Sequence, residues 1–311
     1  MLPTNSARCL RHPEPILYVN RPWVSIAPDP PGFRSTYRGP SHHGGLELFP
    51  RFDRSATVAS VKPADVESRW EFYPCIVDDA PASISLNLWF ESNRPPSGVD
   101  TLYAVGFQIL EPGDHGMGVG EDVAQLHALG DAVVHHAIRM GLYYVGRVRN
   151  NGDWQLTFYG TAGMEAPLEQ AIIDEPARSG RGYRTVSRQD PSWRYYEQFL
   201  LPNAERRQWI SNRRVVEALK SQGDTLERTR RVDHWIYFET AEGRNAFVAA
   251  VRLCGFATVD QVDDGADITA QVFRSEVVEL DAIHSTVMRL DTLAKAHGGD
   301  YDGWETSVEQ A

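Results

Sequence analysis

Apolar and polar residues begin to alternate near Trp70, and this pattern predicts a series of strands. Over 84–90 every second residue is apolar, which is typical of a half-buried strand. The pair Asp78–Asp79 lies ahead of it and predicts a hairpin turn that leads back to a strand over 70–75. A further alternation predicts a strand over 103–109.

The stretch after residue 120 mixes helical and strand patterns. Over 121–140 the apolar residues recur at helical spacing, so a helix with one buried face is expected. Asn151–Gly152 lies between two aromatic-rich segments, and this dipeptide is a strong hairpin signal. The elements expected here are hairpin strands over 143–149 and 154–159, a helix near 168–173 and a strand over 183–187. Such a mixture predicts an α+β sandwich.

The second half of the chain predicts two helices followed by a strand–helix–strand–strand–helix–strand series. A short helix is expected near 195–200. Asn203 is placed to cap a longer helix that runs through Lys220 and stops at Gly223. The series then comprises a strand over 232–238, a helix over 244–254, strands over 258–262 and 268–280 with a bulge near Ser275, a helix capped by Asp281, and a short strand after Trp304. This order defines a ferredoxin-like domain (βαββαβ).

Changes in composition divide the chain into three regions. Residues 1–62 hold nine of the 19 prolines and no sustained periodicity, and proline disfavours long helices and central strands, so an irregular leader is expected. Gln189–Ser192 contains an Asp-Pro pair, which interrupts helices and marks a linker. The predicted domains are therefore an α+β domain of unknown function over 63–188 and the ferredoxin-like domain over 189–311, both α/β sandwiches.

The chain of 311 residues carries a formal net charge of -11. Because this charge repels phosphates and attracts basic partners, direct binding of nucleic acid is not expected. The excess is concentrated in residues 256–311, where twelve acidic residues stand against three basic ones. Two explanations stay open for this acidic region, namely a solvated surface and a surface that binds a basic protein.

Three cysteines, Cys9, Cys75 and Cys254, lie far apart and fit neither a zinc-binding spacing nor a disulfide framework. The first residues lack an apolar run of signal-peptide length. No segment approaches the ~20 apolar residues that a membrane helix needs. A cytoplasmic protein that neither enters a membrane nor holds a cofactor is therefore expected.

Three local motifs suggest ligands, and each has a simpler interpretation. Gly116–Gly120 precedes a helix, but two acids that would repel a phosphate follow at once, so a flexible loop is expected. His127, Asp131 and His135 have metal-binding spacing on a helix, yet they lie opposite its apolar face. Asp300–Gly303 resembles the start of a calcium loop without the remaining ligands. No metal site is predicted.

The strand over 232–238 presents different residues to its two faces. His234 shares a face with apolar residues and is interpreted as a core histidine with a hydrogen-bond partner rather than a catalytic base. Asp233, Trp235 and Tyr237 share the other face. The sequence contains no serine-nucleophile elbow, no H-E-x-x-H helix and no cysteine near a plausible base. No catalytic residues, and hence no enzyme, are predicted.

One basic cluster occurs in the sequence, and it consists of Arg206, Arg207, Arg213, Arg214, Arg228, Arg230 and Arg231. These side chains could contact phosphates. Acidic residues among them favour pairing on a helix surface instead. A nucleic-acid or small-ligand binding module that uses the Arg206–Arg231 cluster is the alternative function, and the aromatic hairpin over 143–159 is a second reason to consider it.

Several motifs occur in a specific order and spacing over about 190–308, namely Gly223–Asp224, Arg231–Phe238, Arg244, Phe247, Gly255–Phe256, Arg274 and Gly299–Glu305. In these motifs the chain resembles the regulator of ribonuclease activity B family, the ribonuclease E inhibitors. The region over 70–188 is similar to an uncharacterised domain that is often fused ahead of such regulators.

The resemblance implies a ferredoxin-like, non-enzymatic protein that binds an RNA-degrading endonuclease and lowers its activity. The scaffold region of that endonuclease is rich in arginine in this family's systems, and arginine pairs well with carboxylates. Exposed tryptophan and tyrosine would anchor the contact. The expected partner-binding residues are Asp233, Trp235, Tyr237, Asp300, Tyr301, Asp302, Trp304 and Glu305.

Overall fold

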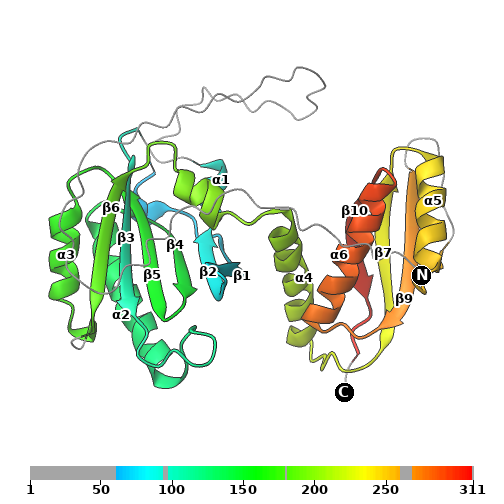
Figure 1. The fold of residues 1–311 in the computed structure, drawn as a ribbon, viewed down its shortest axis with the longest axis horizontal. Coiled ribbons are helices and arrows are strands. Elements are labelled where there is room, and N and C mark those ends of the chain that lie inside the picture. The colour runs from blue at the N-terminus through cyan, green and yellow to red at the C-terminus, as the bar shows by residue number, and fades with distance from the viewer. Residues whose placement is uncertain (1–60, 94–96, 179–180, 260–267, 310–311) are drawn as a thin grey trace, which may run out of the picture.

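The computed structural model describes residues 61–93, 97–178, 181–259 and 268–309, which form two antiparallel sheets with a helix between them (Figure 1). The α+β class predicted from the sequence is confirmed. The predicted leader over 1–62 lies almost entirely outside the described residues. Within the described part of the chain, no helix is both long and apolar enough to cross a membrane.

Six strands form the first sheet in the order β1-β2-β4-β5-β3-β6, and each neighbouring pair is antiparallel. They are β1 (Trp70–Val77), β2 (Ala80–Asn87), β3 (Thr101–Gln108), β4 (Tyr143–Asn150), β5 (Asp153–Gly160) and β6 (Tyr183–Gln189). The hairpin turns Asp78–Asp79 and Asn151–Gly152 have positive φ at every residue. Aspartate, asparagine and glycine tolerate this backbone, which is why both turns are predicted correctly.

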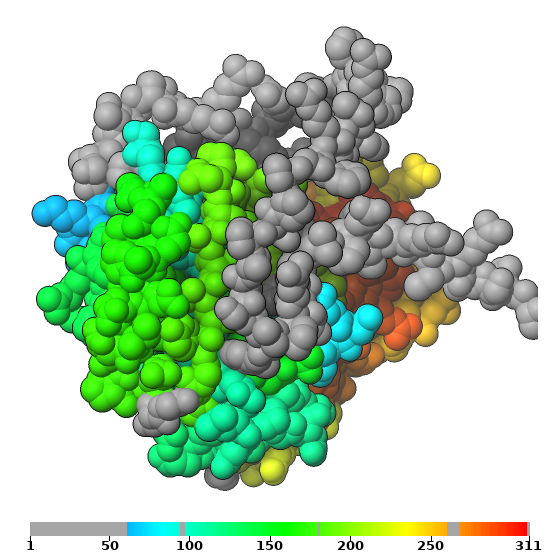
Figure 2. All heavy atoms as spheres, turned by 60° about the vertical axis from the view of Figure 1, so that its left-hand side comes forward, coloured from blue at the N-terminus to red at the C-terminus, as the bar shows by residue number. Residues whose placement is uncertain are grey.

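One face of this sheet is covered by α2 (Gly120–Arg139) and α3 (Glu165–Ile173). Leu126, Leu129 and Val133 recur at helical spacing on α2 and are fully buried against the strands. Figure 2, in which this domain comes forward, shows the green residues of α3 and β6 on its surface.

The opposite face is covered by α1 (Trp89–Ser92) and by a π-helix (Tyr195–Leu200). The strand predicted to run to Phe90 ends at Asn87, so that part of the prediction is wrong. The Asn87 side-chain oxygen accepts the backbone N–H of Trp89 at 3.0 Å. This bond turns the chain into α1 and buries Phe90 in the core.

The second sheet has the order β10-β7-β9-β8 and is fully antiparallel. Its elements are β7 (Arg230–Phe238), α5 (Ala241–Arg252), β8 (Ala257–Thr258), β9 (Ile268–Glu276), α6 (Leu280–Ala296) and β10 (Gly299–Thr306). The predicted ferredoxin-like order βαββαβ is therefore confirmed. Val232 and Ile236 of β7 pack with Phe247 of α5 and Val287 of α6, so both helices cover the same face.

Two details of this sheet differ from the prediction. β9 pairs with β7 without interruption and ends at Glu276, so the bulge predicted near Ser275 is absent from it. The irregularity lies instead in β10, between Tyr301 and Gly303. β10 begins at Gly299, because its pairing with β7 starts there, and Trp304 therefore lies inside the last strand.

Helix α4 (Ala204–Ser221) lies between the two sheets (Figure 1). It begins as predicted, because the Asn203 side chain accepts the backbone N–H of Arg206 at 2.9 Å. Ile210 belongs to the core of the first sheet, whereas Val216 and Leu219 belong to the core of the second. The helix thus contributes to both hydrophobic cores.

Candidate partner-binding surface

One face of the four-stranded sheet carries no helix among the described residues. The helices pack on the face of β7 that presents Val232 and Ile236. Asp233, Trp235 and Tyr237 point the other way, because successive side chains of a strand alternate. Tyr237 is 45% exposed and Trp235 is half-buried. We call this side of the sheet the open face, and three of the predicted partner-binding residues lie along its central strand.

Strand β10 adds acidic residues to the open face. Asp300 lies directly opposite Tyr237, and Glu305 lies opposite Asp233, and directly paired residues share a face. Asp302, the extra residue of the bulge, is exposed beside them. No cation pairs with Asp300, Asp302 or Glu305 anywhere in the described ranges. Three carboxylates without an ion pair among the described residues therefore flank the rings of Trp235 and Tyr237.

The carboxylate of Asp233 is already engaged. It accepts hydrogen bonds from Nε and Nη2 of Arg231, each at 2.7 Å, and from Gln271 at 3.0 Å. The Arg231 guanidinium lies 3.8 Å from the centre of the Phe273 ring. Gln271 and Phe273 lie opposite Trp235 and Asp233, so they also belong to the open face. Sequence reasoning missed both, although the alternation along the predicted strand could have located them.

Tyr301 and Trp304 lie on the helix-covered side. Tyr301 is buried, with its hydroxyl 2.9 Å from Nδ1 of His234. Nε1–H of Trp304 donates to Oδ1 of Asn212 on α4 at 3.0 Å. A one-residue shift in register reverses the side that each following residue faces, so the bulge at Asp302 turns Trp304 inward.

His234 lies in a buried polar cluster beneath the sheet. Its Nε2 is 3.6 Å from Oε1 of Glu276. Oε2 of Glu276 accepts hydrogen bonds from Arg274 at 2.7 Å and from Thr286 at 2.8 Å. Burial disfavours the charged form of Glu276, but its polar neighbours His234, Arg274 and Thr286 outweigh this effect and lower its pKa. His234 therefore has polar neighbours on both ring nitrogens, as expected of a core histidine.

Five of the seven arginines in the predicted basic cluster pair with carboxylates. The pairs join Arg207 to Glu91, Arg213 to Glu71 and Glu217, Arg214 to Glu71, Arg230 to Asp224, and Arg231 to Asp233. A guanidinium that is bound to a carboxylate is less available to a phosphate. The geometry therefore does not favour nucleic-acid binding by this cluster.

The glycine loop and the histidine motif of α2 form neither a phosphate-binding loop nor a metal site in the described residues. Three N–H groups of the loop Gly116–Gly120 donate to backbone carbonyls of residues 111–113, so they are not available to hold a phosphate. His127, Asp131 and His135 are exposed on α2. No three histidine, cysteine or acidic side chains in the described ranges are close enough to hold a metal ion.

The fold and the surface define the C-terminal region as a ferredoxin-like domain that leaves an aromatic sheet face open. Residues 209–306 match the family described as "Regulator of ribonuclease activity B". Residues 68–201 match a "Family of unknown function (DUF695)". The chain therefore carries a domain of the regulator of ribonuclease activity B family, preceded by a DUF695 domain.

No curated protein matches the chain. Among solved structures, the crystal structure of an unknown protein from Galdieria sulphuraria is similar at 12% sequence identity. That match covers 67% of this chain and 98% of the other, with a TM-score of 0.19. A likeness of this strength supports no conclusion about the architecture or the function.

Proposed function

We propose that this protein is a non-enzymatic, cytoplasmic regulator that binds an endoribonuclease of the ribonuclease E type and lowers its activity. The match of residues 209–306 to the regulator family supports the class of partner. The open face of the C-terminal sheet is the proposed binding surface. The observation that carries this choice is the placement of Trp235 and Tyr237 beside Asp300 and Glu305.

The two kinds of side chain have separate roles in the proposed contact. The rings of Trp235 and Tyr237 supply apolar area at little cost in conformational freedom, which is how aromatic residues anchor protein interfaces. The carboxylates of Asp300, Asp302 and Glu305, which pair with no cation of the described residues, attract arginine-rich segments and chiefly raise the association rate. Tyr301 and Trp304, which lie inside, support this surface because Tyr301 bonds to His234 of the neighbouring strand β7 and Trp304 bonds to Asn212 of α4.

Binding of the full chain to the arginine-rich scaffold region of the host's own ribonuclease E-type enzyme tests the proposal. We expect binding at about 50 mM salt that weakens at about 300 mM, because salt screens exposed charges. Tyr237→Ala and Trp235→Ala should each weaken binding by about thirtyfold or more, the size typical of an aromatic anchor. RNA cleavage by the enzyme should slow when the wild-type chain is added.

The double variant Asp300→Asn/Glu305→Gln should slow association about tenfold at low salt. Its matched control is Glu279→Gln/Asp281→Asn, which removes the same charge from exposed residues at the start of α6. Equal loss in both variants would mean that only the net charge matters and would rule out the open face. Absence of binding by the wild-type chain would overturn the function itself.

A further inference from the structure

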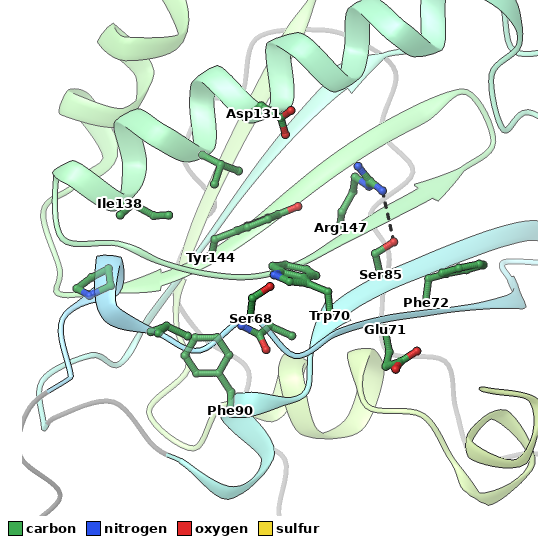
Figure 3. A pocket seen from close by; sticks show the side chains of 14 residues that line it. Ser68, Trp70, Glu71, Phe72, Ser85, Phe90, Asp131, Ile138, Tyr144 and Arg147 are labelled. Atoms are coloured by element: carbon green, nitrogen blue, oxygen red, sulfur yellow. Dashed lines mark hydrogen bonds between the residues drawn. The ribbon is translucent and has the colours of Figure 1, made fainter. Parts of the chain in front are cut away.

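A pocket of about 480 Å³ opens on the first domain, between α2 and the part of the sheet that β1, β2 and β4 form (Figure 3). This volume lies in the range of small-molecule sites. Apolar and charged side chains both line the pocket, including Trp70, Val134, Tyr144, Ser85, Asp131 and Arg147. Such a mixture provides a surface for a ring together with a few polar groups that orient it.

One wall of the pocket is aromatic. The ring centres of Trp70 and Tyr144 are 4.8 Å apart, and their planes meet at 35°. Trp70 lies on the edge strand β1 and is 37% exposed, although a tryptophan usually buries most of its ring. Val134 and Ile138 from α2 add to the apolar lining. An exposed indole above a cavity is well placed to stack on a planar ring.

The other wall carries a cation, Arg147. The Arg147 guanidinium lies 4.5 Å from the centre of the Trp154 ring, with Nη2 3.5 Å from Oγ of Ser85 and Nη1 3.3 Å from Nδ1 of His127. No acidic side chain of the described residues pairs with Arg147 or with its neighbour Arg149. Stacking holds the guanidinium fork in place and leaves its N–H groups able to bind an anion.

A second arginine with the same charge lies close to Arg147. Arg149 lies two residues further along β4, on the same side of the strand, and its guanidinium also faces Trp154. Burial and the nearby Arg147 lower the pKa of Arg149. Burial and both arginines likewise lower the pKa of His127, although Asp131 opposes this shift. Arg147 therefore supplies the positive group of the pocket lining, and a second guanidinium lies beside it on the same strand.

Asp131 adds a hydrogen-bond acceptor to the same space. It lies on α2, one turn after His127, and its carboxylate points toward the pocket rather than to an ion pair with Arg147 (Figure 3). Glu71 points away from the pocket, toward the arginines of α4. The ligand-facing groups are thus a ring platform, a cation with a hydroxyl, and one carboxylate.

We infer that this pocket binds a small ligand that consists of a planar heterocycle and an anionic group, the class to which nucleoside monophosphates belong. The ring stacks against Trp70 and Tyr144, and the phosphate binds the Arg147 guanidinium and the Ser85 hydroxyl. Asp131 accepts hydrogen bonds from amino or hydroxyl groups between the two ends. This site is separate from the open face and does not depend on the proposed ribonuclease partner.

Calorimetric titration of the full chain with adenosine, guanosine, cytidine and uridine 5′-monophosphates tests the inference, with indole-3-acetate as an anion that carries a different ring. We expect at least one of these compounds to bind at or below about 1 mM. The nucleoside without its phosphate should bind at least about tenfold more weakly, because Arg147 then lacks its ion partner. Trp70→Leu should weaken binding by a similar factor.

Arg147→Met keeps much of the packing on Trp154 but removes the charge. This variant should therefore bind a nucleotide and the corresponding nucleoside with the same affinity. Arg147→Lys should restore part of this affinity difference, since lysine returns the charge without the two-pronged guanidinium group. Arg139→Met, an exposed arginine at the end of α2, is the matched control and should bind as the wild type does. Failure of every probe to bind, or binding that Arg147→Met leaves unchanged, overturns the inference.

Discussion

The arginines of α4 and those of β4 have opposite surroundings. Three arginines of α4 reach Glu71 and Glu91 of the first domain, so their charge is neutralised where the two domains meet. Arg147 and Arg149 of β4 stack on Trp154 and pair with no carboxylate of the described chain. Helix α4 has more arginines than strand β4, but its arginines are less available to an anion.

This difference shows that a run of basic residues is a poor guide to an anion site when carboxylates from elsewhere can fold against it. Glu71 is 142 residues away from Arg213, and no local pattern connects them. The arginines of α4 join two domains, whereas Arg147 of β4 lines a cavity and Arg149 lies beside it on the same strand. Four predictions compare arginines that pair with carboxylates and arginines that do not, and they follow in order of decreasing effect.

Asp224→Asn should cause the largest loss of stability, about 4 kcal/mol in the free energy of unfolding. The side chains of Asp224 and Arg230 are almost wholly covered, and Asp224 also accepts the N–H groups of Leu226 and Glu309. The variant leaves Arg230 buried without its counter-charge. Urea unfolding followed by fluorescence measures the loss. Glu227→Gln, an exposed neighbour, should change stability by less than about 0.5 kcal/mol.

The buried pairs should also make stability sensitive to acid. Hydrogen bonds from Arg230 hold the pKa of Asp224 well below its usual range. Burial opposes a similar shift at Asp122, but hydrogen bonds from Arg181 and backbone N–H groups outweigh it and lower that pKa too. A carboxyl group whose pKa is lower in the folded chain than in the unfolded chain stabilises the fold. This stabilisation is complete above the unfolded-state pKa of about 4 and is lost as the pH falls through the folded-state pKa.

We therefore expect the free energy of unfolding to drop by about 2 kcal/mol or more between about pH 6 and pH 3. Urea unfolding at several pH values measures this slope. Asp224→Asn should have a shallower slope than the wild type, because it lacks one of the groups that must be protonated. Parallel slopes in the two proteins would show that Asp224 is not responsible.

Glu71→Gln should destabilise the chain by about 2 kcal/mol, because Arg213 loses a partly buried partner at the contact between the domains. The control is Glu217→Gln, which removes the other, mostly exposed partner of Arg213 and should cost less than about 0.5 kcal/mol. Thermal unfolding of the two variants and the wild type compares them. Equal effects would mean that the arginines of α4 do not join the domains electrostatically.

Arg147→Met and Arg149→Met should change stability least, by about 0.5 kcal/mol or less, since neither arginine has an ion pair with a described residue to lose. Relief of the repulsion between the two guanidinium groups offsets part of the lost cation–π contact. Thermal unfolding checks this value. A loss as large as that of Glu71→Gln would assign these arginines to the fold rather than to a ligand.

Local signals in the sequence were sufficient for most elements of the fold. The hairpins at Asp78–Asp79 and Asn151–Gly152 require positive φ, and the residues that tolerate it are visible in the sequence. The βαββαβ order follows from changes of hydrophobic period, and the cap at Asn203 follows from the residue type. The side of β7 that carries Asp233, Trp235 and Tyr237 also follows from simple alternation.

Only the tertiary structure decided the features that depend on distant partners. The bulge at Asp302 turns Trp304 toward Asn212, although an unbroken alternation would place Trp304 on the open face. The pairing of the α4 arginines and the exposure of Arg147 depend on which segments lie side by side after folding. A sequence records the chemistry of each side chain, but its availability is determined by neighbours that the fold brings from far along the chain.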